Sequence, residues 1–257
     1  MIRLQQLLRE FQYGDRLWAD QDIWKNASPS LKNVLKRLYP GLTARGPWEP
    51  NTEDEQYAWA GLNSYVIYDT KSQYFTELLE DLLRIKSRFP SILDPGLSST
   101  TKVYRGMQAD TQYILDAIRT SSSTPELVSD IRSGLADTIR IATNFRMINS
   151  RSSDFISMTT RANIAADFAN AHDVSESKWP IVAEVQYGDI ERRALMNPKF
   201  MDSLTSMAES EFFFIGNRMP IIGLYIPDPE KWQSEYANDS FFTKIKNALR
   251  RAGTYGS

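Results

Sequence analysis

The chain has 257 residues, of which 42% are hydrophobic and 24% charged, and its formal net charge is −2 at neutral pH. These values are typical of an ordinary globular protein that buries one large core or two smaller ones. They do not favour a general nucleic-acid surface, and the longest apolar runs are far too short to span a bilayer.

The residue types that are rare or absent in this chain exclude several kinds of active site. The chain contains no cysteine, which excludes disulfides, thiolate zinc sites and cysteine nucleophiles. Its one histidine, His172, has no G-x-S-x-G elbow to accompany it and is interpreted as a loop or helix-end residue. With one histidine and no carboxylate cluster, no metal is expected. The first residues lack the apolar segment and cleavage site of a secretory signal, so none is expected.

The first part of the chain reads as helical. Apolar residues at helical spacing predict helices over 2–11, 30–39, 55–69 and 72–89. The stretch 45–55 contains two prolines and an acidic cluster, so it predicts a loop and a boundary. We therefore expect an N-terminal helical extension over 1–55, packed on a main domain over 56–257.

The pattern changes near residue 100. Runs of β-branched and aromatic residues predict strands over 101–107, 154–159, 181–187, 211–216 and 219–226. Helices are expected over 125–145, where apolar residues recur every four positions, over 160–172 after Thr160 as N-cap, and over 241–253. Helices followed by strands that are joined mostly by loops indicate an α+β fold rather than a parallel βαβ sheet.

Four polar residues stand out in these strands or directly before them. Arg105 lies in the apolar strand "VYRGM", Ser157 lies in "FISMT", and Glu209 and Glu211 precede or begin "EFFFIG". Each residue alone is weak evidence for a functional site, because a strand arginine is usually solvated and a serine at a strand end is usually a turn residue. Their order and their context are more specific than any one of them.

With "YRG", "FISMT" and "ESEFFF" in this order, the chain resembles the mono-ADP-ribosyltransferases of the arginine-serine-glutamate class. This family includes bacterial toxins and tailed-phage enzymes that modify host proteins. The matching motifs run from about residue 57 to residue 226. The resemblance implies the ADP-ribosyltransferase fold, in which a mixed or antiparallel two-sheet β core surrounds an NAD cleft, here with an N-terminal helical region. It also implies NAD as co-substrate.

The resemblance assigns roles to individual residues. Arg105 would bind the pyrophosphate with its guanidinium, and Gly106 would let the backbone approach the nicotinamide amide. Glu211 would bind the ribose 2′-OH and stabilise an oxocarbenium-like transition state, while Ser157 would hold Glu211 in position. Phe168 would pack on the nicotinamide ring, although an ordinary core position on an amphipathic helix explains it equally well.

Glu209 indicates which kind of side chain would receive the ADP-ribose, that is, the acceptor. In an extended segment residues i and i+2 point to the same side, so both carboxylates can face one cleft. A carboxylate there can orient an acceptor guanidinium and take its proton. In the family, Glu-x-Glu accompanies arginine acceptors.

The chain departs from the family pattern in three ways. Its middle motif reads Ser-Met-Thr, a helix that looks like an insertion is expected between Arg105 and Ser157, and no aromatic residue lies between Phe200 and Phe212.

The resemblance therefore implies an arginine-specific mono-ADP-ribosyltransferase that uses NAD and acts on a bacterial protein with an exposed arginine. A monomer in the cytoplasm of a bacterial host is expected, with a secreted effector as the alternative. Three other functions stay open: an NAD glycohydrolase that uses the same residues, a non-catalytic phage or virion interaction protein that retains the fold, and an unrelated α+β protein with a chance match.

Overall fold

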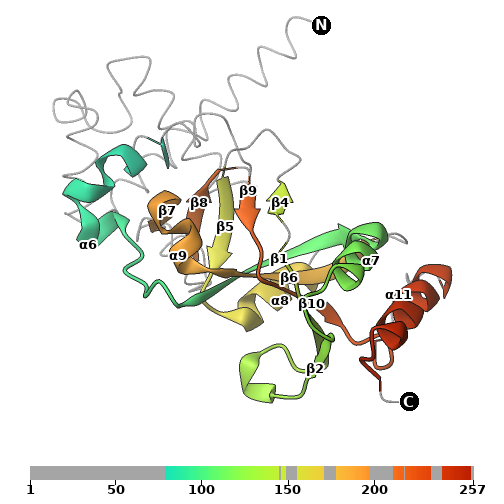
Figure 1. Ribbon diagram of the computed structural model, residues 1–257. Coiled ribbons are helices and arrows are strands. Elements are labelled where there is room, and N and C mark those ends of the chain that lie inside the picture. The colour runs from blue at the N-terminus through green and yellow to red at the C-terminus, as the bar shows by residue number, and fades with distance from the viewer. Residues whose placement is uncertain are drawn as a thin grey trace, which may run out of the picture.

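The computed structural model describes residues 79–80, 82–144, 146–148, 155–170, 178–196, 211–216, 218–232 and 239–255. The helices predicted over 2–11, 30–39 and 55–69 lie outside these residues, as do the proposed boundary near residue 55, His172 and Glu209. The described part combines helices with antiparallel strands, which confirms the α+β prediction (Figure 1).

The main sheet has eight antiparallel strands in the order β2-β3-β10-β6-β1-β5-β8-β7. Their bounds are β1 Lys102–Asp110, β2 Glu126–Val128, β3 Thr138–Ala142, β5 Phe155–Thr159, β6 Lys178–Gln186, β7 Ala194–Met196, β8 Glu211–Ile215 and β10 Gly223–Pro227. Strands β4 (Arg146–Ile148) and β9 (Arg218–Pro220) form a separate two-stranded sheet. In Figure 1, β5 and β8 run across the direction of β1 and β6.

Helices cover both faces of this sheet. The helical elements after residue 85 are η1 Lys86–Arg88, α6 Pro90–Leu93, α7 Thr111–Arg119, η2 Ile131–Ser133, α8 Ala162–Asn170, α9 Tyr187–Ile190, η3 Glu191–Arg193 and α11 Asp239–Arg251. Helices α7 and α11 pack against the face that carries Ile181, whereas α8 packs against the face that carries Val182. No helix in the described ranges is long and apolar enough to cross a membrane.

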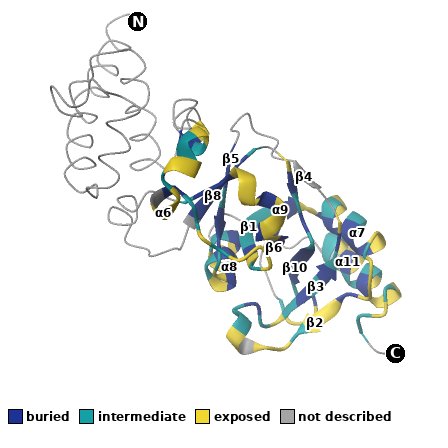
Figure 2. Cartoon of the chain, turned by 60° about the vertical axis from the view of Figure 1, so that its left-hand side comes forward, coloured by how far each residue is buried: buried dark blue, intermediate teal, exposed yellow. Residues whose placement is uncertain are grey.

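Strand β6 lies at the centre of the core. Its residues from Trp179 to Val185 are all buried, because helices or loops cover both of its faces. Figure 2 shows this burial as dark blue on the central strands, with exposed residues on the outer sides of the helices. On α11, Ile245 and Leu249 are fully buried on one face, and Gly253 follows with φ of +83°, as predicted for the end of this helix.

Polar side chains fasten the segment before β1 to α9. The hydroxyl of Tyr187 donates to Asp94 at 3.2 Å, and the ammonium of Lys86 lies 3.2 Å from the same carboxylate. Lys86 also donates to the carbonyl of Ala194 at 2.8 Å. Residues 82–85 are helical, in agreement with the end of the helix predicted over 72–89. The strand that carries Arg105 therefore follows a firmly attached segment.

The prediction of a helix over 125–145 is wrong. This stretch forms β2, the short turn η2 and β3. Two residues have left-handed backbone that a helix cannot contain, Gly134 at φ of +69° and Asp137 at φ of +59°. In β3 the apolar residues alternate, with Ile139 and Ile141 buried, so the period of two overrides the four-residue spacing. The inserted helix expected between Arg105 and Ser157 is thus replaced by α7 and these strands.

Other boundaries also differ from the prediction. The strand predicted over 101–107 extends to Asp110 and leads directly into α7, which was not predicted. The run over 219–226 forms two strands, β9 and β10, which belong to different sheets. Helix α8 begins at Ala162, and the hydroxyl of Thr159 accepts the N–H of Arg161 at 3.1 Å, so Thr160 is not the N-cap. The predicted strands that contain Arg105, Ser157 and Glu211 are confirmed.

Candidate functional site

Strands β1 and β5 meet at one point and then separate. Within the described parts of the two strands, their register has a single pair, Tyr104 opposite Thr159. Beyond this pair β1 continues along β6 as far as Asp110, while β5 runs along β8 back to Phe155. The sheet therefore divides into a β2-β3-β10-β6-β1 part and a β5-β8-β7 part, and we call the Tyr104–Thr159 pair the apex of the opening between them.

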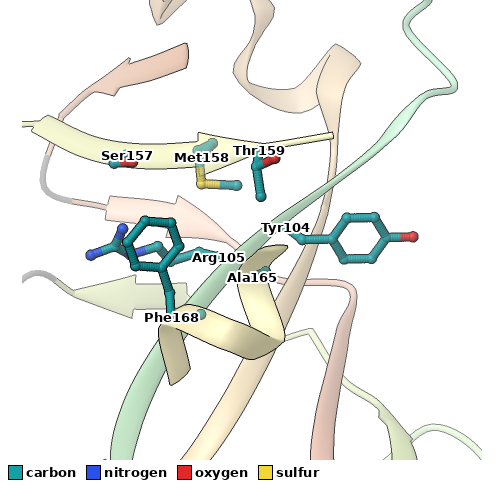
Figure 3. A pocket seen from close by; sticks show the side chains of 8 residues that line it. Tyr104, Arg105, Ser157, Met158, Thr159, Ala165 and Phe168 are labelled. Atoms are coloured by element: carbon teal, nitrogen blue, oxygen red, sulfur yellow. The ribbon is translucent and has the colours of Figure 1, made fainter. Parts of the chain in front are cut away.

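A small pocket lies at this apex. Its walls come from three elements: Tyr104, Arg105 and Gly106 of β1, Ser157, Met158 and Thr159 of β5, and Ala165 and Phe168 of α8. The structure thus brings together Arg105, Gly106, Ser157 and Phe168, which the sequence analysis singled out in three different elements. Figure 3 shows Arg105 and Phe168 extending to the same side, with Ser157 on the strand across from them.

Gly106 lets α8 lie directly on β1. A Cβ atom at this position would lie 1.8 Å from the carbonyl oxygen of Ala165 and 2.9 Å from the amide nitrogen of Ala169. The face of α8 that meets the strand consists of small residues, since Ala162, Ala165 and Ala169 are all buried there. The absence of a side chain at Gly106 therefore has a packing reason, and this close approach positions Phe168 at the pocket.

Glu211 belongs to the same region through its backbone. It pairs with Thr159 in the β5–β8 register, and Ser157 pairs with Phe213 two residues along. The Cα atoms of directly opposite residues lie about 4.5–5.5 Å apart, so the backbone of Glu211 is one strand away from the pocket wall. The structure describes the backbone of Glu211 but not its side chain, and Glu209 lies outside the described residues.

The side chains that line the pocket can bind an anion and an aromatic ring. The guanidinium of Arg105 is permanently charged and has the planar set of N–H donors that suits phosphate oxygens, and the ring of Phe168 has an apolar face. Ser157 adds a hydroxyl that can donate or accept. Among the described residues, no three histidine or acidic side chains gather in an arrangement that could hold a metal ion.

Sequence reasoning missed two polar residues of the pocket wall, Tyr104 and Thr159. Both flank residues that were predicted, so the signal was their position at the crossing of β1 and β5, which only the register reveals. Burial, and next the negative charge of Glu184, raise the pKa of the Tyr104 phenol above its ordinary value. Tyr104 therefore stays protonated at neutral pH, and its ring extends away from Arg105 (Figure 3).

In comparisons with known protein families, curated proteins and solved structures, nothing matches the chain. The function proposed below accordingly depends on the sequence motifs and on the geometry of the pocket.

Proposed function

We propose that the chain is a mono-ADP-ribosyltransferase that transfers ADP-ribose from NAD to an arginine side chain of a protein, with release of nicotinamide. The observation that carries this proposal is the pocket at the apex. Its wall contains Arg105, Gly106, Ser157 and Phe168, each of which the sequence resemblance assigns to NAD. A chance match of motifs gives no reason for these residues to converge on one cavity.

The opening between the two parts of the sheet also supports a proposal about which α+β fold the chain has. We propose that the β core is that of the ADP-ribosyltransferases, with NAD bound between the β1 part and the β5–β8 part. The single register pair at Tyr104 and Thr159 leaves Arg105 and Ser157 on opposite walls of one pocket. A guanidinium from one wall and a hydroxyl from the other suit a substrate with both phosphates and sugar hydroxyls.

The proposed chemistry assigns one task to each group. Arg105 binds the pyrophosphate, Phe168 packs on the nicotinamide ring, and Glu211 stabilises the positive charge that develops on the ribose. The bond between nicotinamide and ribose breaks with its electron pair left on nicotinamide. A new bond then forms from the acceptor guanidinium nitrogen to the same ribose carbon, and the carboxylate of Glu209 takes the proton that this nitrogen loses.

Label transfer tests the proposal directly. The purified chain is incubated with biotin- or radio-labelled NAD and a bacterial lysate, and both labelled proteins and free nicotinamide are measured. Labelled bands that resist nuclease and disappear on treatment that cleaves arginine-linked ADP-ribose would support transfer to arginine. Consumption of NAD without labelled protein would instead indicate a glycohydrolase, and the absence of both would contradict the proposal.

The Glu209→Gln variant separates the acceptor step from cleavage of NAD. Glutamine cannot take the proton of the guanidinium, so transfer to arginine is expected to fall by about 100-fold while NAD hydrolysis changes by less than about threefold. Agmatine, a small guanidine compound, serves as a defined acceptor in place of lysate protein. Equal loss of transfer and hydrolysis would show that Glu209 has no separate role toward the acceptor.

The Ser157→Ala variant tests the hydroxyl on the β5 wall. Its removal is expected to lower the rate of NAD cleavage by about 10- to 100-fold, the usual worth of one hydrogen bond to a charged group. Ser121→Ala is a matched control, because the hydroxyl of Ser121 donates to the carbonyl of Ala142 at 2.9 Å and lies outside the pocket wall. If both variants keep wild-type rates, Ser157 does not act in the reaction.

A further inference from the structure

A fully buried carboxylate lies beside the apex, and the reaction proposed above does not use it. Glu184 of β6 is 0% exposed. Its carboxylate lies 2.8 Å from the ammonium of Lys102 on β1 and 3.1 Å from Nε of Arg140 on β3. It also accepts a hydrogen bond from the hydroxyl of Tyr225 on β10. One carboxylate therefore connects four neighbouring strands, and we call Glu184, Lys102, Arg140 and Tyr225 the Glu184 network.

Gly223 makes room for the longest connection in this network. Arg140 pairs with Tyr225 on β10, so its guanidinium must cross β10 to reach Glu184 on β6. It crosses beside Gly223, which lies directly opposite Glu184. A Cβ atom at Gly223 would lie 3.0 Å from the carboxylate and 3.2 Å from Nη2 of Arg140. The path of the ion pair thus depends on a residue without a side chain.

The buried ion pairs of the Glu184 network are expected to add little to the free energy of unfolding. Burial alone raises the pKa of the Glu184 carboxyl, but hydrogen bonds from Arg140, Lys102 and Tyr225 outweigh burial and hold the pKa below its usual range. The carboxylate is therefore charged at neutral pH. Buried ion pairs are often no more stable than apolar side chains of the same volume, whereas they do restrict geometry. A geometric task is therefore the better explanation for this group.

The register connects the network to the pocket. Tyr104 lies opposite Glu184 on one side and opposite Thr159 on the other, so the apex pair and the buried carboxylate form one row across the sheet. The rings of Tyr104 and Tyr225 meet edge to face, with centroids 6.5 Å apart. Figure 3 shows the ring of Tyr104 extending away from Arg105, as expected for consecutive residues of a strand.

We infer that the Glu184 network is a positioning device for the apex: it fixes Tyr104, and through the backbone of Tyr104 the direction in which Arg105 enters the pocket. In its catalytic consequence this inference rests on the proposed function, because Arg105 is the group assigned to the NAD pyrophosphate. Among the described residues, Tyr104 is part of a single register pair with β5, whereas β1 pairs with β6 along its whole length, so the β6 side is the more continuous support of its backbone. Glu184 and Tyr225 are positioning residues and touch no substrate.

Two readouts test the inference, one kinetic and one spectroscopic. Glu184→Gln should raise the KM for NAD by roughly 10-fold, since small displacements of a binding group can cost up to about 100-fold. The kcat should change much less, because the residues assigned to bond cleavage lie on β5 and β8. With fluorotyrosine incorporated throughout, the ¹⁹F resonance of Tyr104, assigned by its loss in Tyr104→Phe, should shift in Glu184→Gln without any ligand.

If Glu184→Gln does not fold, two variants that disturb the network less are used in its place. Tyr225→Phe removes one donor to the carboxylate and keeps the ring, and Gly223→Ala obstructs the path of Arg140. Both should shift the Tyr104 resonance and raise the KM in the same direction. Leu249→Ala is the control, because it weakens the core on the opposite face of the sheet and should lower Tm without either effect.

The outcomes distinguish this inference from the proposed function. If the variants lower Tm as Leu249→Ala does, but leave the Tyr104 resonance and the KM at wild-type values, the positioning role is wrong. If the wild type does not consume NAD, the proposed function fails, and the resonance alone still decides whether the network holds the apex. An unchanged resonance would then overturn the inference, and a shift would support it.

Discussion

The Glu211→Gln variant is expected to cleave NAD about 100- to 1,000-fold more slowly than the wild type, while it folds normally. Removal of one well-placed electrostatic stabiliser of a transition state typically costs this much. The backbone of Glu211 lies opposite Thr159 of β5, which lines the pocket, so the residue is one strand from Ser157 and two strands from Arg105. Nicotinamide release from saturating NAD measures kcat, and NAD titration by calorimetry measures binding separately.

The control for this experiment is Glu126→Gln, which changes an exposed glutamate at the far edge strand of the sheet. It should leave kcat unchanged. A Glu211→Gln variant that retains more than half of the wild-type kcat would remove Glu211 from the catalytic set, and with it the main chemical argument for an ADP-ribosyltransferase. A selective loss of NAD affinity with unchanged kcat would give Glu211 a binding role only.

The Gly106→Ala variant is expected to unfold at a Tm roughly 10 °C below that of the wild type and to lose the pocket. The added methyl would lie 1.8 Å from the carbonyl oxygen of Ala165, and backbone cannot rotate away as a side chain can. Overpacking of this kind costs on the order of 3 kcal/mol, which corresponds to several degrees in a domain of this size. Helix α8 must then move, and Phe168 moves with it.

Gly96→Ala provides the comparison. A Cβ atom at Gly96 meets nothing within 4 Å, and the only cost is its left-handed φ of +65°, worth about 1–2 kcal/mol. This variant should lose some stability but keep wild-type NAD turnover. Thermal denaturation and nicotinamide release are measured for both variants. If Gly106→Ala keeps both the wild-type Tm and its activity, the close contact between α8 and β1 is not required.

The strands that carry the motifs were predicted correctly because their local signals are strong. Phe212 to Ile215 form an uninterrupted apolar run, and Val103 to Met107 combine a β-branched, two long and an aromatic side chain around Gly106. Arg105 and Ser157 interrupt such runs with polar groups, which is a local anomaly that sequence reasoning can detect. Their convergence on one pocket was an expectation from the family resemblance, and the geometry is consistent with it.

The stretch 125–145 was misinterpreted because two periodicities compete there. Apolar residues four apart favour a helix, but Leu127 is 46% exposed and Ile139 fully buried, so the residues of that spacing do not share one environment. Pairing of β3 with β10 decides the outcome, and that pairing joins segments more than 80 residues apart. Helix α7 was missed even though Ile114, Ala117 and Ile118 have helical spacing after Asp110.

The sequence by itself determined the α+β class, the strands that carry Arg105, Ser157 and Glu211, and the chemistry available to these side chains, because residue type and short-range periodicity are local properties. Only the tertiary structure decided where β1 and β5 separate, why Gly106 must lack a side chain, and that Glu184 is buried beside the apex. These features depend on strand register and on contacts between distant segments, and no local pattern in a single chain specifies them.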